Sequence, residues 1–396
     1  MSSDVKGRVL LVNRALPAHW AGGLERHVED LAIGLAAAGW GVDLLAAPLG
    51  ADEFDRYRDF GINVHPASCA APRRYSLGYM LGIGHIIEKL LTKERFDVIH
   101  AQEFGLGLWR APRPAPPIVL SVHGTITSET PMHPDVYRTL GPGGRARAWA
   151  RYGRRFLFAP AWRRALGRAD AILIDSAFSR GELERIAPEC LAKTRLVPLA
   201  VREAGDYPDR AASRERLGWR GVQLLTIGRL EWAKGHELAL EALAGLREFK
   251  WHYTIAGEGS WRPAIERAIG RLGLGGRVRL AGRVSQADKL AMLAGADLFV
   301  WPERTHPAFG LAGLEALLAD TPVVATRRGA IPEVIGERGW LAEPTAESLA
   351  GALKPLLADP ARLAAARAGL REDALARFAF ERMVAGVESV YKSLLP

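Results

Sequence analysis

The sequence predicts an α/β protein made of two doubly wound, Rossmann-like domains, and two observations lead to this prediction. Short apolar runs of strand length alternate along the whole chain with segments whose apolar residues recur at helical spacing. The 396 residues are also too many for one ordinary hydrophobic core, and they suit two domains of about 200 residues each. We therefore expect two lobes that face each other across a cleft.

The first domain is predicted over residues 1–200, and it begins with a βαβ unit. A strand at Val9–Val12 is followed by apolar residues at helical spacing, and Gly39 suits the left-handed conformation that often follows a helix. A second strand is predicted at Val42–Ala46. The later strands of this domain are predicted at Val98–His100, Ile118–Val122 and Ala171–Asp175. Alternating strands and helices of this kind form a parallel sheet.

The second domain is predicted over residues 201–379. Its start is placed in a polar stretch near Val197–Pro208, where the alternation loosens. The strands of the second series are predicted at Gln223–Ile227, Tyr253–Ala256, Val278–Leu280, Leu298–Trp301 and Thr321–Ala325. A last helix follows at about Phe380–Leu394, and we expect residues 380–396 to cross back onto the first domain.

Composition narrows the class of protein. Hydrophobic residues make up 48% and charged residues 24% of the chain, which is the balance of a globular protein. The two cysteines, Cys69 and Cys190, cannot form a disulfide framework or a zinc site, and this usage fits a reducing cytoplasm. Residues 1–12 lack the apolar core of a signal peptide, and the apolar stretch Tyr75–Ile87 is too short to span a membrane. We therefore expect a cytoplasmic location and no transmembrane helix.

The net charge of +9 is concentrated in one segment. Between Val136 and Ala169 the sequence has no acidic residue but nine arginines, interleaved with aromatic residues. The arginines are Arg138, Arg145, Arg147, Arg151, Arg154, Arg155, Arg163, Arg164 and Arg168. One interpretation is a face that meets an anionic membrane or a lipid-diphosphate acceptor, which would place the chain peripherally on the inner face of a membrane. A solvated helical surface is the alternative, and no nucleic-acid partner is expected because no nucleic-acid module accompanies the segment.

Three glycine-containing turns are candidates for binding an anion, and the first precedes the first helix. Gly22 and Gly23 stand directly before the helix that is predicted to begin at Leu24. Glycines let a backbone approach a ligand closely, and free N–H groups at a helix N-terminus attract an anion. The pattern is not the GxGxxG dinucleotide fingerprint, and a purely structural tight turn explains it equally well.

The second turn, Gly228–Gly235, follows a predicted strand of the second domain and precedes a helix. It therefore lies at the carboxyl edge of the sheet, where open α/β sheets bind ligands. We expect Arg229 and Lys234 to converge there on a diphosphate, with about 1.5–3 kcal/mol from each charge-assisted hydrogen bond. The alternative is a solvated basic turn.

The third cluster, Phe309–Leu317, follows the predicted strand that ends near Trp301. Gly310 is predicted to open a helix whose N-terminal amides face the phosphates, and Glu315 leans back toward that end from about one turn inside. A carboxylate there can accept hydrogen bonds from ribose hydroxyls, and burying it among leucine and alanine without a partner would be costly. The alternative is a glutamate on an exposed helix surface.

Together these segments resemble the retaining glycosyltransferases of family 4, which have the GT-B fold, and the resemblance covers essentially the whole chain. The order and spacing of several motifs are more specific than any one of them. The matching segments are Gly22–His27, Ser121–Gly124, Gly228–Gly235, Ala256–Gly259, Phe309–Ala316, Thr321–Ala325 and Ile331–Glu333.

The resemblance implies a role for each candidate residue. It implies that Arg229 and Lys234 hold the donor diphosphate and stabilise the charge that grows on the leaving group, and that Glu315 holds the ribose. His123 falls where the family has a histidine against the donor sugar at the reaction centre. A lone histidine after a strand is more often structural, but the Ser-Val-His-Gly context favours the catalytic role here. The other implied donor-site residues are Gly22 and Gly23 near the phosphates, Arg283 and Val284 at the base, and Phe309, Gly310 and Leu311.

The chain departs from the family pattern at two places. The family often has a second glutamate eight residues before the position of Glu315, in contact with the donor sugar, and this chain has Pro307 there. Either Glu303 or His306 replaces that glutamate, or the sugar is held differently. The segment Val197–Val201 also lacks the Asn-Gly that usually follows its proline, which concerns the hinge more than catalysis.

The resemblance further implies a mechanism. We expect the acceptor hydroxyl to attack from the face that the diphosphate leaves, through an oxocarbenium-like state and without a protein nucleophile. No Asp-x-Asp motif is present, so neither a tightly held metal nor a cofactor is expected besides the UDP- or GDP-sugar co-substrate. The expected acceptor is a glycan, a lipid-linked or a small-molecule hydroxyl, in cell-surface polysaccharide or lipid-linked glycan assembly. The alternatives are a nucleotide-sugar epimerase, a glycosyl phosphorylase and a non-catalytic relative that binds nucleotide sugars.

Overall fold

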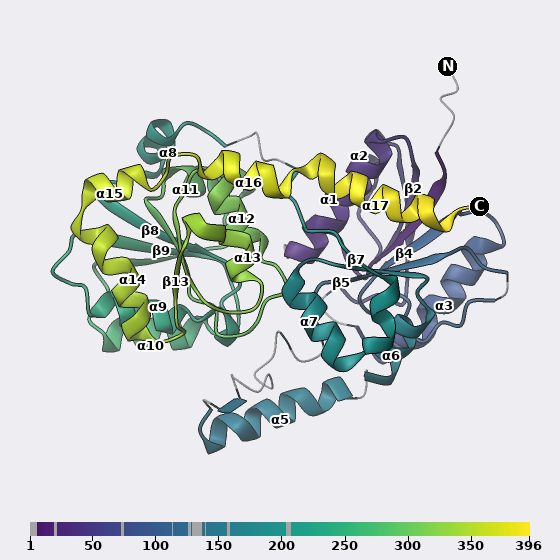
Figure 1. Cartoon of the computed structure of the whole chain (residues 1–396), viewed down its shortest axis with the longest axis horizontal. Coiled ribbons are helices and arrows are strands. Elements are labelled where there is room, and N and C mark those ends of the chain that lie inside the picture. The colour runs from purple at the N-terminus through teal and green to yellow at the C-terminus, as the bar shows by residue number, and fades with distance from the viewer. Residues whose placement is uncertain are drawn as a thin grey trace. The chain divides into compact units, whose positions relative to one another are not determined.

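The computed structural model describes residues 6–19, 22–72, 75–112, 114–125, 128, 137–138, 140–156, 159–202 and 207–396 (Figure 1). The chain divides into two compact units. The first contains Met1–Ile126, Trp149–Ala200 and Phe380–Pro396, and the second contains Thr127–Ala148 and Val201–Ala379. Each unit has a parallel sheet with helices on it, which confirms the predicted fold class.

The first unit is built on a parallel sheet of seven strands in the order β3-β2-β1-β4-β5-β6-β7. The strands are β1 (Arg8–Val12), β2 (Gly41–Ala46), β3 (Ile62–Pro66), β4 (Val98–Gln102), β5 (Ile118–Val122), β6 (Ala171–Ile174) and β7 (Thr194–Leu196). The order of connection reverses between β1 and β4, which is the point where doubly wound sheets open a crevice at their carboxyl edge.

Successive residues of each strand point to opposite faces of the first sheet, and the buried ones form two separate hydrophobic cores, one on each face. Helices cover both faces. One core receives α1 (Gly23–Ala37), α2 (Ala51–Asp59) and α17 (Phe380–Leu394). The other receives α3 (Leu77–Leu91), α6 (Ala159–Arg168) and α7 (Ala177–Ile186). The remaining helical segments before residue 201 are α5 (Pro142–Phe156) and the 3-10 helix η1 (Pro188–Lys193).

The C-terminal helix α17 is a tightly packed part of the first unit. A Cβ at Gly34 of α1 would lie 2.6 Å from a methyl group of Val384, so the two helices meet at a glycine. The Tyr391 hydroxyl lies 2.6 Å from Nδ1 of His100, in the middle of β4. Glu388 accepts hydrogen bonds from two side chains near the start of the unit. These contacts explain why residues 380–396 belong to the first unit although they end the chain.

The second unit is built on a parallel sheet of six strands in the order β10-β9-β8-β11-β12-β13. The strands are β8 (Val222–Ile227), β9 (Trp251–Ala256), β10 (Val278–Gly282), β11 (Leu298–Trp301), β12 (Val323–Thr326) and β13 (Trp340–Ala342). The order of connection reverses between β8 and β11, so the loops after these two strands flank the expected binding crevice.

The helices of the second unit connect these strands. They are α8 (Arg210–Leu217), η2 (Trp232–Lys234), α9 (His236–Ala244), α10 (Arg262–Arg271), α11 (Gln286–Gly295), α12 (Leu311–Leu318), α13 (Ile331–Ile335), η3 (Gly336–Arg338), α14 (Ala346–Ala358), α15 (Pro360–Ala365) and α16 (Leu370–Phe378). Buried residues of α9, α10 and α14 share one core with the strands, and this core holds the sheet rigid behind its carboxyl edge.

Three properties of the described residues concern membrane spans, disulfides and metal sites. None of the helices they form is long and apolar enough to cross a bilayer. Cys69 and Cys190 are both free thiols. Within the same described ranges, no group of three or more histidine, cysteine, aspartate or glutamate side chains is placed to hold a metal ion.

Candidate active site

The loop after β8 is fixed at the carboxyl edge of the second sheet by its neighbour after β9. Leu230 donates its N–H to the Glu258 carbonyl oxygen at 2.9 Å. A Cβ at Gly257 would overlap the carbonyl oxygen of Gly228, and a Cβ at Gly259 would overlap that of Leu230. The glycines of the Ala-Gly-Glu-Gly motif are therefore required by the close approach of two backbones, and they hold the basic loop in one position.

The other side of the same loop rests on the segment after β11. Gly235 has a φ of 66° between η2 and α9, and a Cβ there would overlap the carbonyl oxygen of Pro302. Arg304 donates its N–H to the Ala233 carbonyl oxygen at 2.8 Å. The turn that carries Arg229 and Lys234 is thus clamped from both sides.

Lys234 is held by a buried carboxylate. Its Nζ donates to Glu303 Oε2 at 2.9 Å, and Glu303 Oε1 accepts from the Thr305 hydroxyl at 3.0 Å. Glu303 is only 1% exposed, and both of its oxygens have a partner. The structure therefore assigns Glu303 a role in holding Lys234, and its place as a substitute for a carboxylate at Pro307 stays a prediction.

Arg229, by contrast, is exposed at the edge of the sheet. Its guanidinium makes no hydrogen bond or ion pair within the described part of the chain, and only its carbonyl oxygen is used, by His236 Nε2 at 3.1 Å. Burial lowers the pKa of His236, so this histidine is neutral and serves as a structural donor. The Arg229 side chain is left available to an anion.

The N-terminus of α12 lies at the same edge, and its glycines are explained by one aromatic ring. Gly310 has a φ of 123°, and a Cβ at Gly310 or Gly313 would overlap the Trp301 ring. No side chain caps this helix end, so its N–H groups remain open to an anion. Phe309 is buried, with its ring 5.3 Å from that of Phe378, so only the Phe309 backbone can contact a ligand.

Glu315 has a partner within the protein. Lys289 of α11 donates to Glu315 Oε1 at 2.6 Å, and both side chains are mostly buried. The expectation that this carboxylate needs a ligand to be buried is therefore wrong, because Lys289 already compensates its charge. The role of Glu315 in holding ribose stays a prediction, and Leu311 lies half-buried at the start of the same helix.

Arg283 and Val284 follow β10 at the same carboxyl edge. Gly257 donates its N–H to the Gly282 carbonyl oxygen at 2.7 Å, which ties this loop to the one after β9. Arg283 is exposed and Val284 is half-buried. The loops after β8, β9, β10 and β11 therefore bring Arg229, Lys234, Arg283 and the start of α12 to one edge of one sheet.

In the first unit, His123 lies directly after β5. Its Nδ1 is 2.9 Å from Asp175 Oδ2, and its Nε2 is 2.7 Å from Gln102 Oε1. The His27 ring of α1 meets the His123 ring edge to face, with centroids 5.0 Å apart. Asp175 and Gln102 were not predicted, yet each stands at the carboxyl end of an apolar strand, and that position is the signal that would have found them.

Gly22 and Gly23 open α1 in the same unit. Gly22 is the N-cap, with a φ of −126° that any residue can adopt, and Gly23 is the first helical residue. Backbone strain therefore does not require either glycine. No side chain caps the helix, which leaves its first N–H groups uncovered, as an anion site needs. The turn residues Trp20 and Ala21 lie outside the described residues.

Comparison with known proteins identifies the family. Residues 21–203 match the profile described as Glycosyltransferase Family 4, and residues 221–359 match the one described as Glycosyl transferases group 1. The glycogen synthase of Mycobacterium tuberculosis is 31% identical over 399 residues, covering 92% of this chain and 91% of that protein. The chain belongs to glycosyltransferase family 4.

Two further comparisons place this glycosyltransferase among its relatives. A GDP-mannose-dependent alpha-(1-6)-phosphatidylinositol dimannoside mannosyltransferase of Mycobacterium tuberculosis is 32% identical over 206 residues, 50% of this chain and 52% of that protein. Among solved structures, the sucrose-phosphate synthase of Thermosynechococcus elongatus aligns with a TM-score of 0.81 at 21% identity, covering 98% of this chain and 99% of that one. The likeness shows that the glycosyltransferase has the GT-B fold.

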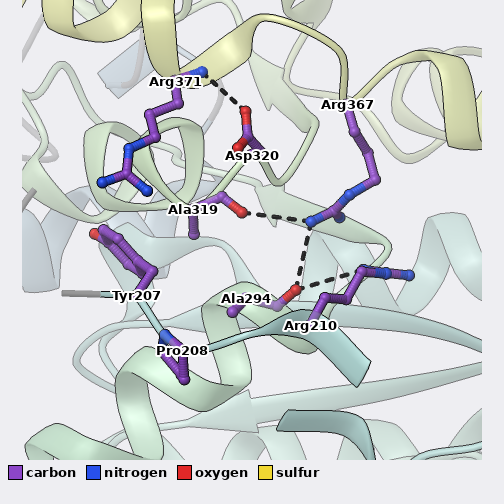
Figure 2. Close-up of a pocket in the computed structure, with 8 residues that line it drawn as sticks. All are labelled: Tyr207, Pro208, Arg210, Ala294, Ala319, Asp320, Arg367 and Arg371. Atoms are coloured by element: carbon purple, nitrogen blue, oxygen red, sulfur yellow. Dashed lines mark hydrogen bonds between the residues drawn. The ribbon is translucent and has the colours of Figure 1, made fainter. Parts of the chain in front are cut away.

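Two cavities formed by described residues of the second unit both lie at the amino edge of the sheet. The smaller, of about 140 Å³, lies before β11 and β12. Figure 2 shows Arg367 and Arg210 both aimed at the Ala294 carbonyl oxygen, and the Arg371 N–H aimed at Asp320. These groups cap helix ends, and burial lowers the pKa of Arg367 to about 10. The larger cavity, of about 380 Å³, lies before β8, β9 and β10, so neither is at the predicted donor site.

The arginine-rich segment forms α5 and α6. Its described side chains include Arg138, Arg145, Arg147, Arg163 and Arg164, which are all exposed. Trp149 is 52% exposed, whereas Trp162 is buried in the first core. The side chains at 151, 152 and 154–158 lie outside the described ones. The exposed part of the segment fits both a solvated surface and a surface that meets an anionic partner.

Proposed function

We propose that this glycosyltransferase moves a sugar from a nucleoside-diphosphate sugar to a hydroxyl acceptor, with retention of the anomeric configuration. One observation carries the proposal: three anion-binding features share the carboxyl edge of the second sheet. They are the exposed guanidinium of Arg229, the ammonium of Lys234 and the uncapped N-terminus of α12. A diphosphate is the ligand that such a combination suits.

The chemistry follows from how each cation is held. Lys234 uses one of its three N–H donors on Glu303, so two remain for phosphate oxygens, and its ammonium is fixed in place before the donor binds. Preorganised charge of this kind stabilises the negative charge that develops on the leaving diphosphate. The leaving diphosphate then takes the proton of the attacking hydroxyl, and the protein supplies no nucleophile.

The relatives bear on the substrate class. One relative is named for its dependence on GDP-mannose, and the relative that aligns over most of this chain is named a glycogen synthase. We propose a nucleoside-diphosphate hexose as donor, with UDP and GDP as the first bases to test. For the acceptor we propose a glycan of cell-surface polysaccharide or lipid-linked glycan assembly.

A substrate-omission experiment tests the proposal. The purified chain is given each nucleoside-diphosphate sugar with an acceptor panel, and the anomeric proton coupling of the product is read by NMR. Retained configuration and dependence on the acceptor support the proposal. Donor conversion without acceptor would indicate an epimerase, a requirement for inorganic phosphate would indicate a phosphorylase, and binding without turnover would indicate a non-catalytic relative.

An anionic membrane as the site of the acceptor is a second proposal, which rests on exposed apolar groups. Leu77 and Leu81 lie one turn apart on α3, and they are 67% and 63% exposed. Arg163 and Arg164 are exposed on α6, which covers the same face of the first sheet. Exposed leucines and arginines on helices that cover one face of a sheet suit the boundary of an anionic bilayer. Flotation with phosphatidylglycerol vesicles that Leu81→Asp abolishes would support this partner, and no flotation of the wild type would exclude it.

A further inference from the structure

The ring of His123 is gripped at both nitrogens by acceptor oxygens. Nδ1 faces Asp175 Oδ2 at 2.9 Å, and Nε2 faces Gln102 Oε1 at 2.7 Å. The His123 side chain is only 9% exposed, so these are contacts in a largely dry environment. With the Gln102 amide oriented so that Oε1 faces the ring, both contacts are hydrogen bonds only when both ring nitrogens carry a proton. With the amide turned round, its NH2 group, which is buried without a partner in the present orientation, would donate to a bare Nε2, and the NMR experiment below distinguishes the two states.

The buried carboxylate of Asp175 requires a positive charge beside it. Asp175 is buried directly after β6, and among the described residues His123 is its hydrogen-bonding partner and its counter-charge. Burial raises the pKa of Asp175, and the contact with His123 opposes that rise. A buried carboxylate beside a neutral ring would be an uncompensated charge, which is costly. An imidazolium removes this cost.

The other titratable groups that the structure describes around the ring do not compete for this role. His27 on α1 and His100 on β4 are buried, and burial lowers the pKa of each, that of His100 to about 3, so both are neutral. From α7, Glu182 binds the Thr125 hydroxyl and is paired with Arg185. Among the described residues, His123 is therefore the group that compensates the negative charge of Asp175.

We propose that Asp175 is a positioning residue that keeps His123 doubly protonated, with the ring fixed between Asp175 and Gln102. A ring with both N–H groups in use cannot accept a proton from the acceptor hydroxyl. His123 instead presents a fixed positive charge at the carboxyl edge of the first sheet. Its use in catalysis rests on the proposed function, in which the leaving diphosphate takes the proton.

The protonation state is tested by NMR on the full chain labelled with ¹⁵N-histidine, with the His123 signal assigned from His123→Gln. In the wild type we expect both ring nitrogens to carry a proton at pH 7. In Asp175→Asn the second proton should be lost at a pH about 1–3 units lower, because an opposite charge at this distance is removed. The matched control is Asp170→Asn, directly before β6, where among the described residues the carboxylate binds only the N–H of Ile118.

Transfer kinetics separate positioning from a merely structural role. The alkaline limb of the kcat profile should move to lower pH in Asp175→Asn by the same amount as the NMR transition, and it should stay in place in Asp170→Asn. A loss of kcat that is equal at all pH values would overturn the proposal. An NMR spectrum of the wild type that shows one unprotonated His123 nitrogen at pH 7 would also overturn it, and this measurement does not depend on the folding of any variant. Because the NMR readout needs no substrate, failure of the proposed function would show separately, as an absence of transfer with the NMR result intact.

Discussion

Replacing Lys234 with methionine tests two roles of this residue: binding the donor diphosphate and compensating the buried charge of Glu303. The change removes the ammonium that binds Glu303 at 2.9 Å, and methionine keeps most of the apolar stem. Glu303, 1% exposed, is then left with the hydrogen bond from Thr305 alone. Removing one partner of a buried pair costs about 3–5 kcal/mol. Because the Lys234 side chain is 30% exposed and Thr305 still donates, we expect about 2 kcal/mol here.

Thermal unfolding and transfer kinetics measure the two effects. One kcal/mol lowers the melting temperature of a domain of this size by about 2–4 °C, so Lys234→Met should melt about 4–8 °C below the wild type. Losing a charge-assisted hydrogen bond of about 1.5–3 kcal/mol to the diphosphate should lower kcat/KM by about 10–150-fold. The measurements are differential scanning fluorimetry and a steady-state transfer assay.

The double variant Lys234→Met/Glu303→Gln is the decisive control. It removes the unpaired buried carboxylate, so it should regain most of the lost melting temperature and yet remain as slow as Lys234→Met. Transfer at the wild-type rate by the double variant would refute the place of Lys234 in the site. An unchanged melting temperature in the single variant would refute the buried pair.

Three further predictions concern the rest of the molecule. Glu315→Gln should weaken nucleotide binding, measured by calorimetry, more than it lowers kcat, because ribose contacts are shared by ground and transition states; unchanged affinity would remove Glu315 from the site. Gly310→Ala should destabilise the fold by about 1–3 kcal/mol in thermal unfolding, since its Cβ would overlap the Trp301 ring, whereas Gly351→Ala, where a Cβ meets open space, should not. The free energy of unfolding should fall as the pH drops below about 6.5 toward 3, because His100 has a pKa of about 3 in the folded protein and binds its proton more readily in the unfolded chain. The measurement is chemical denaturation at a series of pH values. A free energy of unfolding that does not fall with pH, or one that falls equally steeply in His100→Asn, would contradict this.

The strands that the sequence predicts well are the buried ones. All five residues of β5 (Ile118–Val122) are buried, and the predicted bounds agree with the observed ones. The strands that were not predicted are Ile62–Pro66, Thr194–Leu196 and Trp340–Ala342, and each is an edge strand of its sheet. An edge strand is half-exposed, so it lacks the continuous apolar run that marks an inner strand.

In the candidate site, features formed by residues close together in the sequence could be predicted, and contacts between distant residues could not. The glycine turns and the basic residues at 229 and 234 are visible because each motif is contiguous in sequence. The ion pairs Lys234 with Glu303 and Lys289 with Glu315 join residues 69 and 26 positions apart, and no periodicity reports such a pairing. The reason for Gly310 was also hidden, because the ring that excludes a side chain there belongs to the preceding strand.

Nucleotide binding to the wild type and to Arg229→Ala, measured by isothermal titration calorimetry with UDP, GDP and ADP, tests the central claim most directly. Arg229 is exposed at the carboxyl edge of the second sheet, and its guanidinium has no partner among the described residues, so its removal should leave the fold intact. The account predicts that one of these nucleotides binds the wild type and that Arg229→Ala weakens it by about 10–150-fold. Equal affinity in the two proteins would contradict a diphosphate site at this edge, as would an absence of binding by all three nucleotides.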